Sequence, residues 1–130
     1  MKIFIIAGED SGDKLGTAII DGLRNALKNS PTFVGIGGTG MQSRGMNSIF
    51  PLSELSVMGF LEIASQYKNL KKRLNQTVSC ILDEQPDILL TIDAPEFCFR
   101  VAKRVKYLNK NIPIAHYVAP TVWAWRPKRA

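Results

Sequence analysis

The stretch that decides the fold is QPDILLTIDAPEF, at Gln85–Phe97. Pro86 interrupts the preceding helical pattern, and the apolar run Ile88–Ile92 that follows is short and bounded by turn-forming residues. Such a run is typical of a strand that is buried on both faces inside a parallel sheet. It ends on Asp93, and open parallel sheets bind ligands beyond the carboxyl ends of their strands. Asp93 is therefore the main candidate for chemistry; the alternative is that it only caps a helix beginning near Glu96.

The amino-terminal part of the chain predicts a strand, a helix and a second strand. Lys2–Ala7 and Phe33–Ile36 are apolar and rich in β-branched or aromatic residues, as strands are. Between them, apolar residues recur at helical spacing from Leu15 to Leu27, and Ser11 or Asp13 is the expected N-cap. This order predicts a right-handed βαβ unit.

The rest of the chain continues the alternation. Asn47–Pro51 is a candidate short strand, a long helix is expected to begin at Ser65 or Asn69, and another helix spans Glu96–Asn109 before a strand at Ile112–Val118. The inward-facing residues of the last helix are expected to be Phe97, Val101, Val105 and Leu108. Alternating strands and helices predict an α/β fold with a doubly wound, Rossmann-like, mostly parallel sheet.

Polar loops follow several of the predicted strands and should meet at one edge of the sheet. They are Gly8–Asp13, Gly37–Gly40 and Asp93–Glu96, with His116 near the end of the last strand. We expect them to form one crevice, although His116 has the alternative of a purely structural, hydrogen-bonded histidine. The candidate substrate-binding residues are Glu9, Ser11, Asp13, Gly37, Gly38, Glu96 and His116.

Gly35–Gly40 formally matches the G-x-G-x-x-G pattern of dinucleotide-binding sites. That pattern belongs to the turn after the first strand of a βαβ unit, with a helix directly behind it. Here it follows the second strand, and Met41–Gly45 is too short for a crossover helix. A loop that a substrate approaches closely is the favoured interpretation, and a dinucleotide-binding oxidoreductase module is the alternative.

The composition indicates an ordinary globular domain. The chain has 130 residues, 45% of them hydrophobic and 22% charged, and a net charge of +6. We expect a cytoplasmic location, because no apolar run is long enough to span a bilayer and no signal peptide is recognisable. Cys80 and Cys98 lack metal-type spacing and are expected to be buried thiols. No metal or cofactor is expected, and nucleic acid is not an expected partner, because the basic residues carry no aromatic-interleaved stripe.

A basic run in the long helix follows an apolar segment at Val57–Leu61. An apolar patch flanked by lysines suits an anionic membrane face. The alternatives are that the lysines form a solvated helix face and that the apolar segment belongs to the core. The residues expected to contact a membrane or acyl chains are Val57, Met58, Phe60, Lys68, Lys71 and Lys72.

Four segments together resemble one enzyme family. They are GEDSGD at Gly8–Asp13, VMGFLE at Val57–Glu62, IDAPEF at Ile92–Phe97 and HYVAPTVWAWRPKR at His116–Arg129. In this order and spacing they resemble lipid-A-disaccharide synthase, a bacterial glycosyltransferase, and the resemblance covers essentially the whole chain. Departures from the family pattern occur at Asp10, where GEASGD is usual, and at Glu96 and Cys98, where IDAPDFN is usual.

The resemblance implies a two-domain glycosyltransferase of the B-type fold. The family joins UDP-2,3-diacylglucosamine to 2,3-diacylglucosamine 1-phosphate, forming a β(1→6) disaccharide phosphate and UDP, without a metal ion and at the inner face of the cytoplasmic membrane. By this resemblance, residues 1–130 are the amino-terminal, acceptor-side α/β domain, incomplete, and Asp93 is the general base. Glu9, Asp13 and His116 would orient the acceptor sugar.

The proteins of this family are nearly three times as long as this chain. The donor-nucleotide domain is therefore expected to be absent from the 130 residues. We therefore expect the 130 residues alone to be inactive and to need a separate C-terminal half; a homodimer is the other expected assembly. The alternative is a non-catalytic, truncated remnant of the family.

Overall fold

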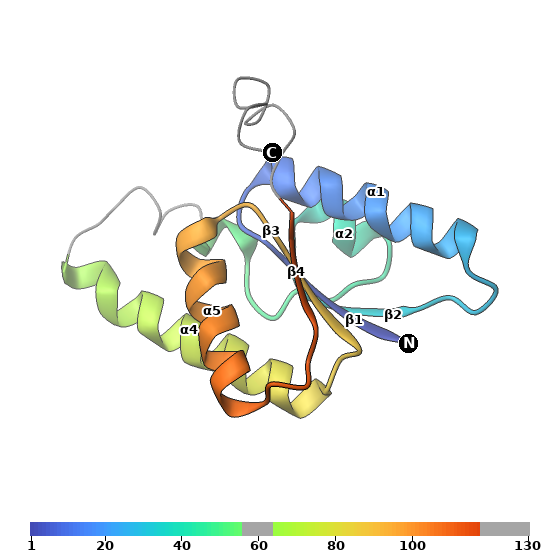
Figure 1. Cartoon of the computed structure of the whole chain (residues 1–130). Helices are drawn as coiled ribbons and strands as arrows, with labels where there is room; N and C mark the ends of the chain where they lie inside the picture. Colours follow the sequence, from blue (N-terminus) through green and yellow to red (C-terminus); the bar gives the residue numbers. More distant parts are fainter. Residues whose placement is uncertain (56–63, 118–130) are drawn as a thin grey trace, which may run out of the picture.

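The computed structural model of the chain describes residues 1–55 and 64–117 (Figure 1). Its centre is a four-stranded sheet with the order β2-β1-β3-β4. All its strand pairs are parallel, which confirms the predicted sheet. The strands are β1 (Lys2–Ala7), β2 (Thr32–Ile36), β3 (Ile88–Ile92) and β4 (Ile114–Tyr117).

Helices cover both faces of this sheet (Figure 1). On one face α1 (Asp10–Ala26) packs with the short α2 (Thr39–Ser43). On the other, α4 (Ala64–Glu84) packs with α5 (Pro95–Leu108). The chain passes from β1 to β2 on one side, then crosses β1 to continue at β3. This is the doubly wound α/β arrangement, and its switch point lies between β1 and β3.

The core forms where the sequence is almost wholly apolar. Phe4, Ile5, Ile6 and Ala7 of β1 are fully buried, because β1 is flanked by strands on both sides and by helices on both faces. In β3 Leu89 and Ile92 are also fully buried. The bounds of β1 and β3 agree with the apolar runs from which they were predicted. A strand that is buried on both faces has a nearly continuous apolar sequence, so the strand ends where the apolar run ends.

Three local expectations were wrong. The first helix begins at Asp10 with Glu9 as its N-cap, so neither Ser11 nor Asp13 caps it. Residues 47–51 form no strand; only a bridge between Gly35 and Ser48 joins this segment to β2. In α5, Phe97, Val101 and Val105 are buried as expected, whereas Leu108 is 51% exposed because the helix ends there beyond the sheet.

Within the ranges 1–55 and 64–117, no helix is both long and apolar enough to cross a bilayer. Apart from the partly buried Arg73, the basic residues of α4 and α5 are exposed.

Candidate functional site

The candidate residues meet at the carboxyl edge of the sheet because all strand pairs are parallel. Across this edge, Gly37 and Gly38 follow β2, Glu9 and Ser11 follow β1, Asp93 and Glu96 follow β3, and His116 lies near the end of β4. Ala7 is the register partner of Ile92, so the loops after β1 and β3 leave the sheet side by side. They do so at the switch point, where ligands of such sheets usually bind.

The turn after β3 has an uncommon backbone. Asp93 and Ala94 have φ angles of 53° and 43°, in the left-handed region that residues with a side chain rarely adopt. Ala94, rather than Asp93, is the N-cap of α5, so the interpretation of Asp93 as the helix cap does not hold. Two successive left-handed residues are costly, and such conformations are concentrated at functional sites. The partly exposed Asp93 is held in this turn by a 3.0 Å hydrogen bond from its N–H to the carbonyl of Tyr117.

The turn is built against the loop after β1. A Cβ atom at Gly8 would overlap the Cβ of Ala94. Only a glycine therefore allows the two loops to approach this closely. This contact fixes the position of the Glu9 loop relative to Asp93.

We expect Gly8→Ala to lower the free energy of unfolding by about 1–3 kcal/mol, because the added methyl overpacks the Gly8–Ala94 contact. Ala94→Gly in the same chain removes the overlapping Cβ and should restore most of the loss. Gly22→Ala is the matched control: in α1 an added Cβ meets no described atom within 4 Å, and the change should raise stability slightly. Urea unfolding followed by circular dichroism measures the free energy of unfolding of the wild type and of these three variants. If the double variant is no more stable than Gly8→Ala, the contact between these loops is wrong.

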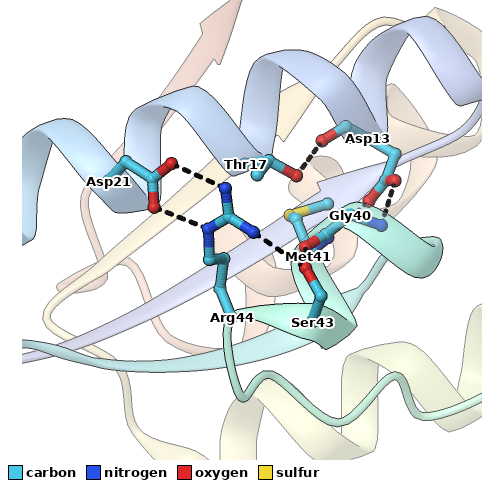
Figure 2. Close-up of polar contacts among 7 residues, drawn as sticks. All are labelled: Asp13, Thr17, Asp21, Gly40, Met41, Ser43 and Arg44. Carbon is cyan, nitrogen blue, oxygen red and sulfur yellow. Dashed lines mark hydrogen bonds and ion pairs between the residues drawn. The ribbon is translucent and has the colours of Figure 1, made fainter.

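Asp13 holds the glycine loop, as Figure 2 shows in part. Asp13 is only 6% exposed. Its carboxylate accepts three backbone hydrogen bonds: Oδ1 from the N–H of Gly38 at 2.8 Å and of Met41 at 3.0 Å, and Oδ2 from the N–H of Gly40 at 2.8 Å. These groups belong to the amino-terminal end of α2, whose N-cap is Gly38. Asp13 on α1 therefore caps a helix that starts 26 residues later in the chain.

This arrangement gives Asp13 the observed part of holding the glycine loop, through backbone hydrogen bonds to both carboxylate oxygens, and leaves its contact with substrate a prediction. It also weighs against the dinucleotide alternative. The N–H groups that would cradle a pyrophosphate are occupied by a carboxylate of the chain itself, and α2 has only five residues. Gly35 of the G-x-G-x-x-G match lies inside β2, where an added Cβ would overlap the carbonyl of Ile5.

A second contact joins α1 to the end of α2 on the solvent side (Figure 2). Arg44 donates from Nε and Nη2 to the two carboxylate oxygens of Asp21, at 2.8 and 3.1 Å. The hydrogen bond from Arg44 lowers the pKa of Asp21. Both side chains are exposed, so this pair contributes far less to stability than the buried Asp13 carboxylate.

The carboxyl edge is acidic although the chain as a whole is basic. Five of the 11 acidic residues follow β1 or β3 here: Glu9, Asp10, Asp13, Asp93 and Glu96. Glu9 and Ser11 are exposed at the start of α1. Glu96 is exposed in the first turn of α5, 3.7 Å from Arg100. Carboxylates accept hydrogen bonds from hydroxyl groups and repel phosphate, so this edge suits a sugar better than a diphosphate.

His116 contacts a residue that the sequence did not single out. Its Nδ1 lies 2.6 Å from Oγ1 of Thr91, its register partner on β3. Thr91 is 1% exposed, whereas His116 is exposed. Cys98 of α5 lies beside Thr91. Burial raises the pKa of the Cys98 thiol to about 12, and its hydrogen bond with Thr91 acts in the opposite direction. A threonine inside a strand gives no signal of such a role until the strand register is known.

The lysines expected to face a membrane lie on α4. Lys68, Lys71 and Lys72 are exposed, whereas Arg73 is bound to Glu54 at 2.6 Å and stacks over Phe50 at 4.8 Å. The basic run therefore contains three solvent-facing lysines and one structural arginine. Their expected apolar companions, Val57, Met58 and Phe60, lie outside the described residues.

Comparison with known proteins gives one consistent result. The family model described as lipid-A-disaccharide synthetase matches residues 3–130. The lipid-A-disaccharide synthase of Rhodospirillum centenum is 47% identical over 130 residues, and that of Ruegeria pomeroyi is 49% identical over 130 residues. Both alignments cover 100% of this chain and 32% of the relative. The relative from Rhodopseudomonas palustris is 43% identical over 129 residues, which are 99% of this chain and 33% of that protein.

The chain thus spans about a third of the length of the curated relatives it matches. Its parallel sheet and its match over nearly all residues agree with the resemblance carried by the four sequence segments. The chain belongs to the lipid-A-disaccharide synthetase family.

Proposed function

We propose that this chain is the amino-terminal, acceptor-side part of a lipid-A-disaccharide synthase. In the complete enzyme, 2,3-diacylglucosamine would be transferred from its UDP conjugate to the 6-hydroxyl of 2,3-diacylglucosamine 1-phosphate. The observation that carries this proposal is the acidic carboxyl edge at the switch point, with Asp93 in a left-handed turn beside the loop of Glu9. The donor nucleotide would be bound by the remaining two thirds of the enzyme, supplied by the same polypeptide or by a separate chain.

Asp93 is proposed as the general base. As the acceptor 6-oxygen forms its bond to the donor anomeric carbon, the bond from that carbon to the diphosphate oxygen breaks. The hydroxyl proton passes to the Asp93 carboxylate, and UDP leaves with the bonding electrons. Asp93 is partly exposed at the end of β3, so its carboxylate can be reached by a substrate that lies over the edge of the sheet.

The neighbouring groups are suited to holding a sugar. Glu9 and Glu96 are exposed carboxylates on the two loops that meet at the switch point, and each can accept hydrogen bonds from sugar hydroxyls. Gly37 and Gly38 are kept in place by Ser48 and Asp13 through hydrogen bonds of 3.1 and 2.8 Å. Gly38 is partly exposed, so its backbone can be approached by a ligand, whereas Gly37 is buried. Asp13 enters this proposal as the residue that holds the loop.

A coupled assay tests the proposed function. The 130-residue chain is incubated with UDP-2,3-diacylglucosamine and 2,3-diacylglucosamine 1-phosphate, alone and joined to the carboxyl-terminal two thirds of the Ruegeria pomeroyi relative. We expect product only from the joined protein, because the donor site lies in the added part. Absence of product from the joined protein, with the intact relative active in parallel, would favour the alternative of a non-catalytic remnant.

We also propose that the chain works at the cytoplasmic face of an anionic membrane, where its acylated substrates reside. The support is the group of exposed lysines on α4, Lys68, Lys71 and Lys72. Val57, Met58 and Phe60 are proposed to contact acyl chains next to them. A lysine near an anionic bilayer contributes about 1 kcal/mol to binding.

Replacing Lys71 and Lys72 by glutamine should weaken binding of the chain to vesicles of phosphatidylglycerol and phosphatidylcholine roughly thirtyfold, since two such charges contribute about 2 kcal/mol. Lys14→Gln with Lys28→Gln is the matched control, because it removes two exposed charges on or next to α1, on the other side of the sheet. Sedimentation with vesicles at low and high salt measures both. If the two double variants lose vesicle binding equally, binding follows net charge alone, and the proposal that the α4 lysines face the membrane is wrong.

A further inference from the structure

We propose that Thr91 is a positioning residue, whose buried hydroxyl holds the imidazole of His116 in one tautomer with its Nε2–H directed to an oxygen of the acceptor sugar. This inference rests on the proposed function and deepens it. Neither the sequence segments of the family resemblance nor the match itself singles out Thr91, which becomes visible only in the register of β3 and β4.

The first step is the geometry of the pair. Thr91 and His116 are register partners on neighbouring parallel strands, so their side chains leave the sheet on the same face. The distance of 2.6 Å from Thr91 Oγ1 to His116 Nδ1 is that of a short hydrogen bond. The threonine is 1% exposed while the histidine is exposed. A fixed, buried group therefore orients a ring whose other side reaches solvent.

The second step is the position of the protons. The Thr91 hydroxyl has one hydrogen, which it can donate either to an unprotonated His116 Nδ1 at 2.6 Å or to the carbonyl of Ala115 at 3.5 Å. The shorter contact takes the hydrogen. The Cys98 thiol beside Thr91 keeps its own proton, since burial raises its pKa to about 12, and can donate it to the threonine oxygen. Nδ1 is then an acceptor, and a neutral ring carries its hydrogen on Nε2.

The third step is the ligand. A neutral imidazole with an Nε2–H is a hydrogen-bond donor, and its natural partner is an oxygen lone pair of a sugar hydroxyl, ether or acyl carbonyl. The surrounding edge supplies carboxylates, which only accept hydrogen bonds. His116 would thus add a donor beside these acceptors, so that a sugar hydroxyl could give its hydrogen to a carboxylate and accept one from His116.

The chain's single histidine makes the tautomer directly measurable. The 130-residue chain is labelled with ¹⁵N-histidine and its long-range ¹⁵N–¹H spectrum is recorded at pH 8, where an ordinary imidazole is neutral. We expect the Nε2–H tautomer almost alone in the wild type and in Thr91→Ser, which keeps the hydroxyl. Thr91→Val keeps the shape and loses the hydroxyl, so its ring should show a mixture of tautomers. An Nδ1–H tautomer or a mixture in the wild type overturns the inference without any variant.

The second arm measures the contact with ligand. N-acetylglucosamine 1-phosphate, a soluble stand-in for the acceptor head group, is titrated into the three chains. We expect the His116 Nε2 signal to move, and Thr91→Val to bind roughly fivefold to tenfold more weakly, as for the loss of one oriented hydrogen bond, with rescue in Thr91→Ser. If the ligand moves the Gly38 amide but not the His116 signal, this inference alone fails. If it moves neither, the proposed acceptor site fails with it.

Discussion

Replacing Asp93 by asparagine should reduce disaccharide formation by the joined, full-length protein about 10²- to 10⁴-fold, the usual contribution of a general base. Asparagine has almost the same shape but does not take up the proton of the acceptor hydroxyl. It also tolerates the left-handed conformation that Asp93 adopts, with φ of 53°, so the loss should appear in turnover and not in folding. Asp93→Ala would not separate a loss of turnover from a loss of folding, because alanine is strained in this conformation.

An aspartate-to-asparagine substitution at the amino end of β3 gives the control. Asp87 precedes β3 and accepts a 2.7 Å hydrogen bond from the backbone N–H of Lys2, at the amino edge of the sheet. Asp87→Asn keeps an oxygen for that bond and should leave turnover within about twofold of the wild type, since it lies at the opposite end of the strand from the proposed site. Both variants are compared by product formation and by circular dichroism. Wild-type turnover in Asp93→Asn would exclude Asp93 as the base.

Replacing Asp13 by alanine should have the largest effect on stability among the site residues, a loss of about 2–4 kcal/mol in the free energy of unfolding. Three N–H groups at the start of α2 would lose their acceptor, and the site is too buried for water to replace the carboxylate freely. Asp13→Asn should lose less, because one oxygen still accepts while the amide NH₂ faces a backbone N–H.

Urea unfolding of Asp13→Ala, Asp13→Asn and Asp21→Ala measures this effect. Asp21→Ala is the control on the same helix: it removes the exposed pair with Arg44 and should shift the unfolding midpoint only slightly. The amide signals of Gly38, Gly40 and Met41 should move in the Asp13 variants and stay in place in the control. Equal midpoints for Asp13→Ala and Asp21→Ala would show that the carboxylate does not hold the loop.

Much of the fold could be predicted because its central strands are almost wholly apolar. Lys2–Ala7 and Ile88–Ile92 were predicted with the bounds that the structure shows, since β1 lies between two strands and two helical layers and its sequence has no reason to alternate. The parallel, doubly wound arrangement followed from the alternation of strands and helices. The gathering of the polar loops at one edge then followed from the parallel direction of the strands.

The functions of single residues within that edge could not be predicted in the same way. Asp13 was expected to cap its own helix, but the backbone N–H groups that its carboxylate binds lie 25 to 28 positions away in the chain. The short distance between Thr91 and His116 depends on the register of β3 with β4. The left-handed backbone at Asp93 and Ala94 depends on the close approach of Gly8. Each is a contact between two loops or two strands, which a local sequence pattern does not contain.

The central claim, that the carboxyl edge binds the acceptor, is tested most directly by titrating the ¹⁵N-labelled chain with a short-chain 2,3-diacylglucosamine 1-phosphate and following the backbone amides. The amides of Gly8, Gly38, Asp93 and Ala94 should move together with one dissociation constant. Those of Thr32, Asp87 and Asn111 at the amino edge should not move, and UDP added alone should leave the carboxyl-edge signals in place. Movement confined to the amino edge, or the same movement caused by UDP alone, would contradict an acceptor site at this edge.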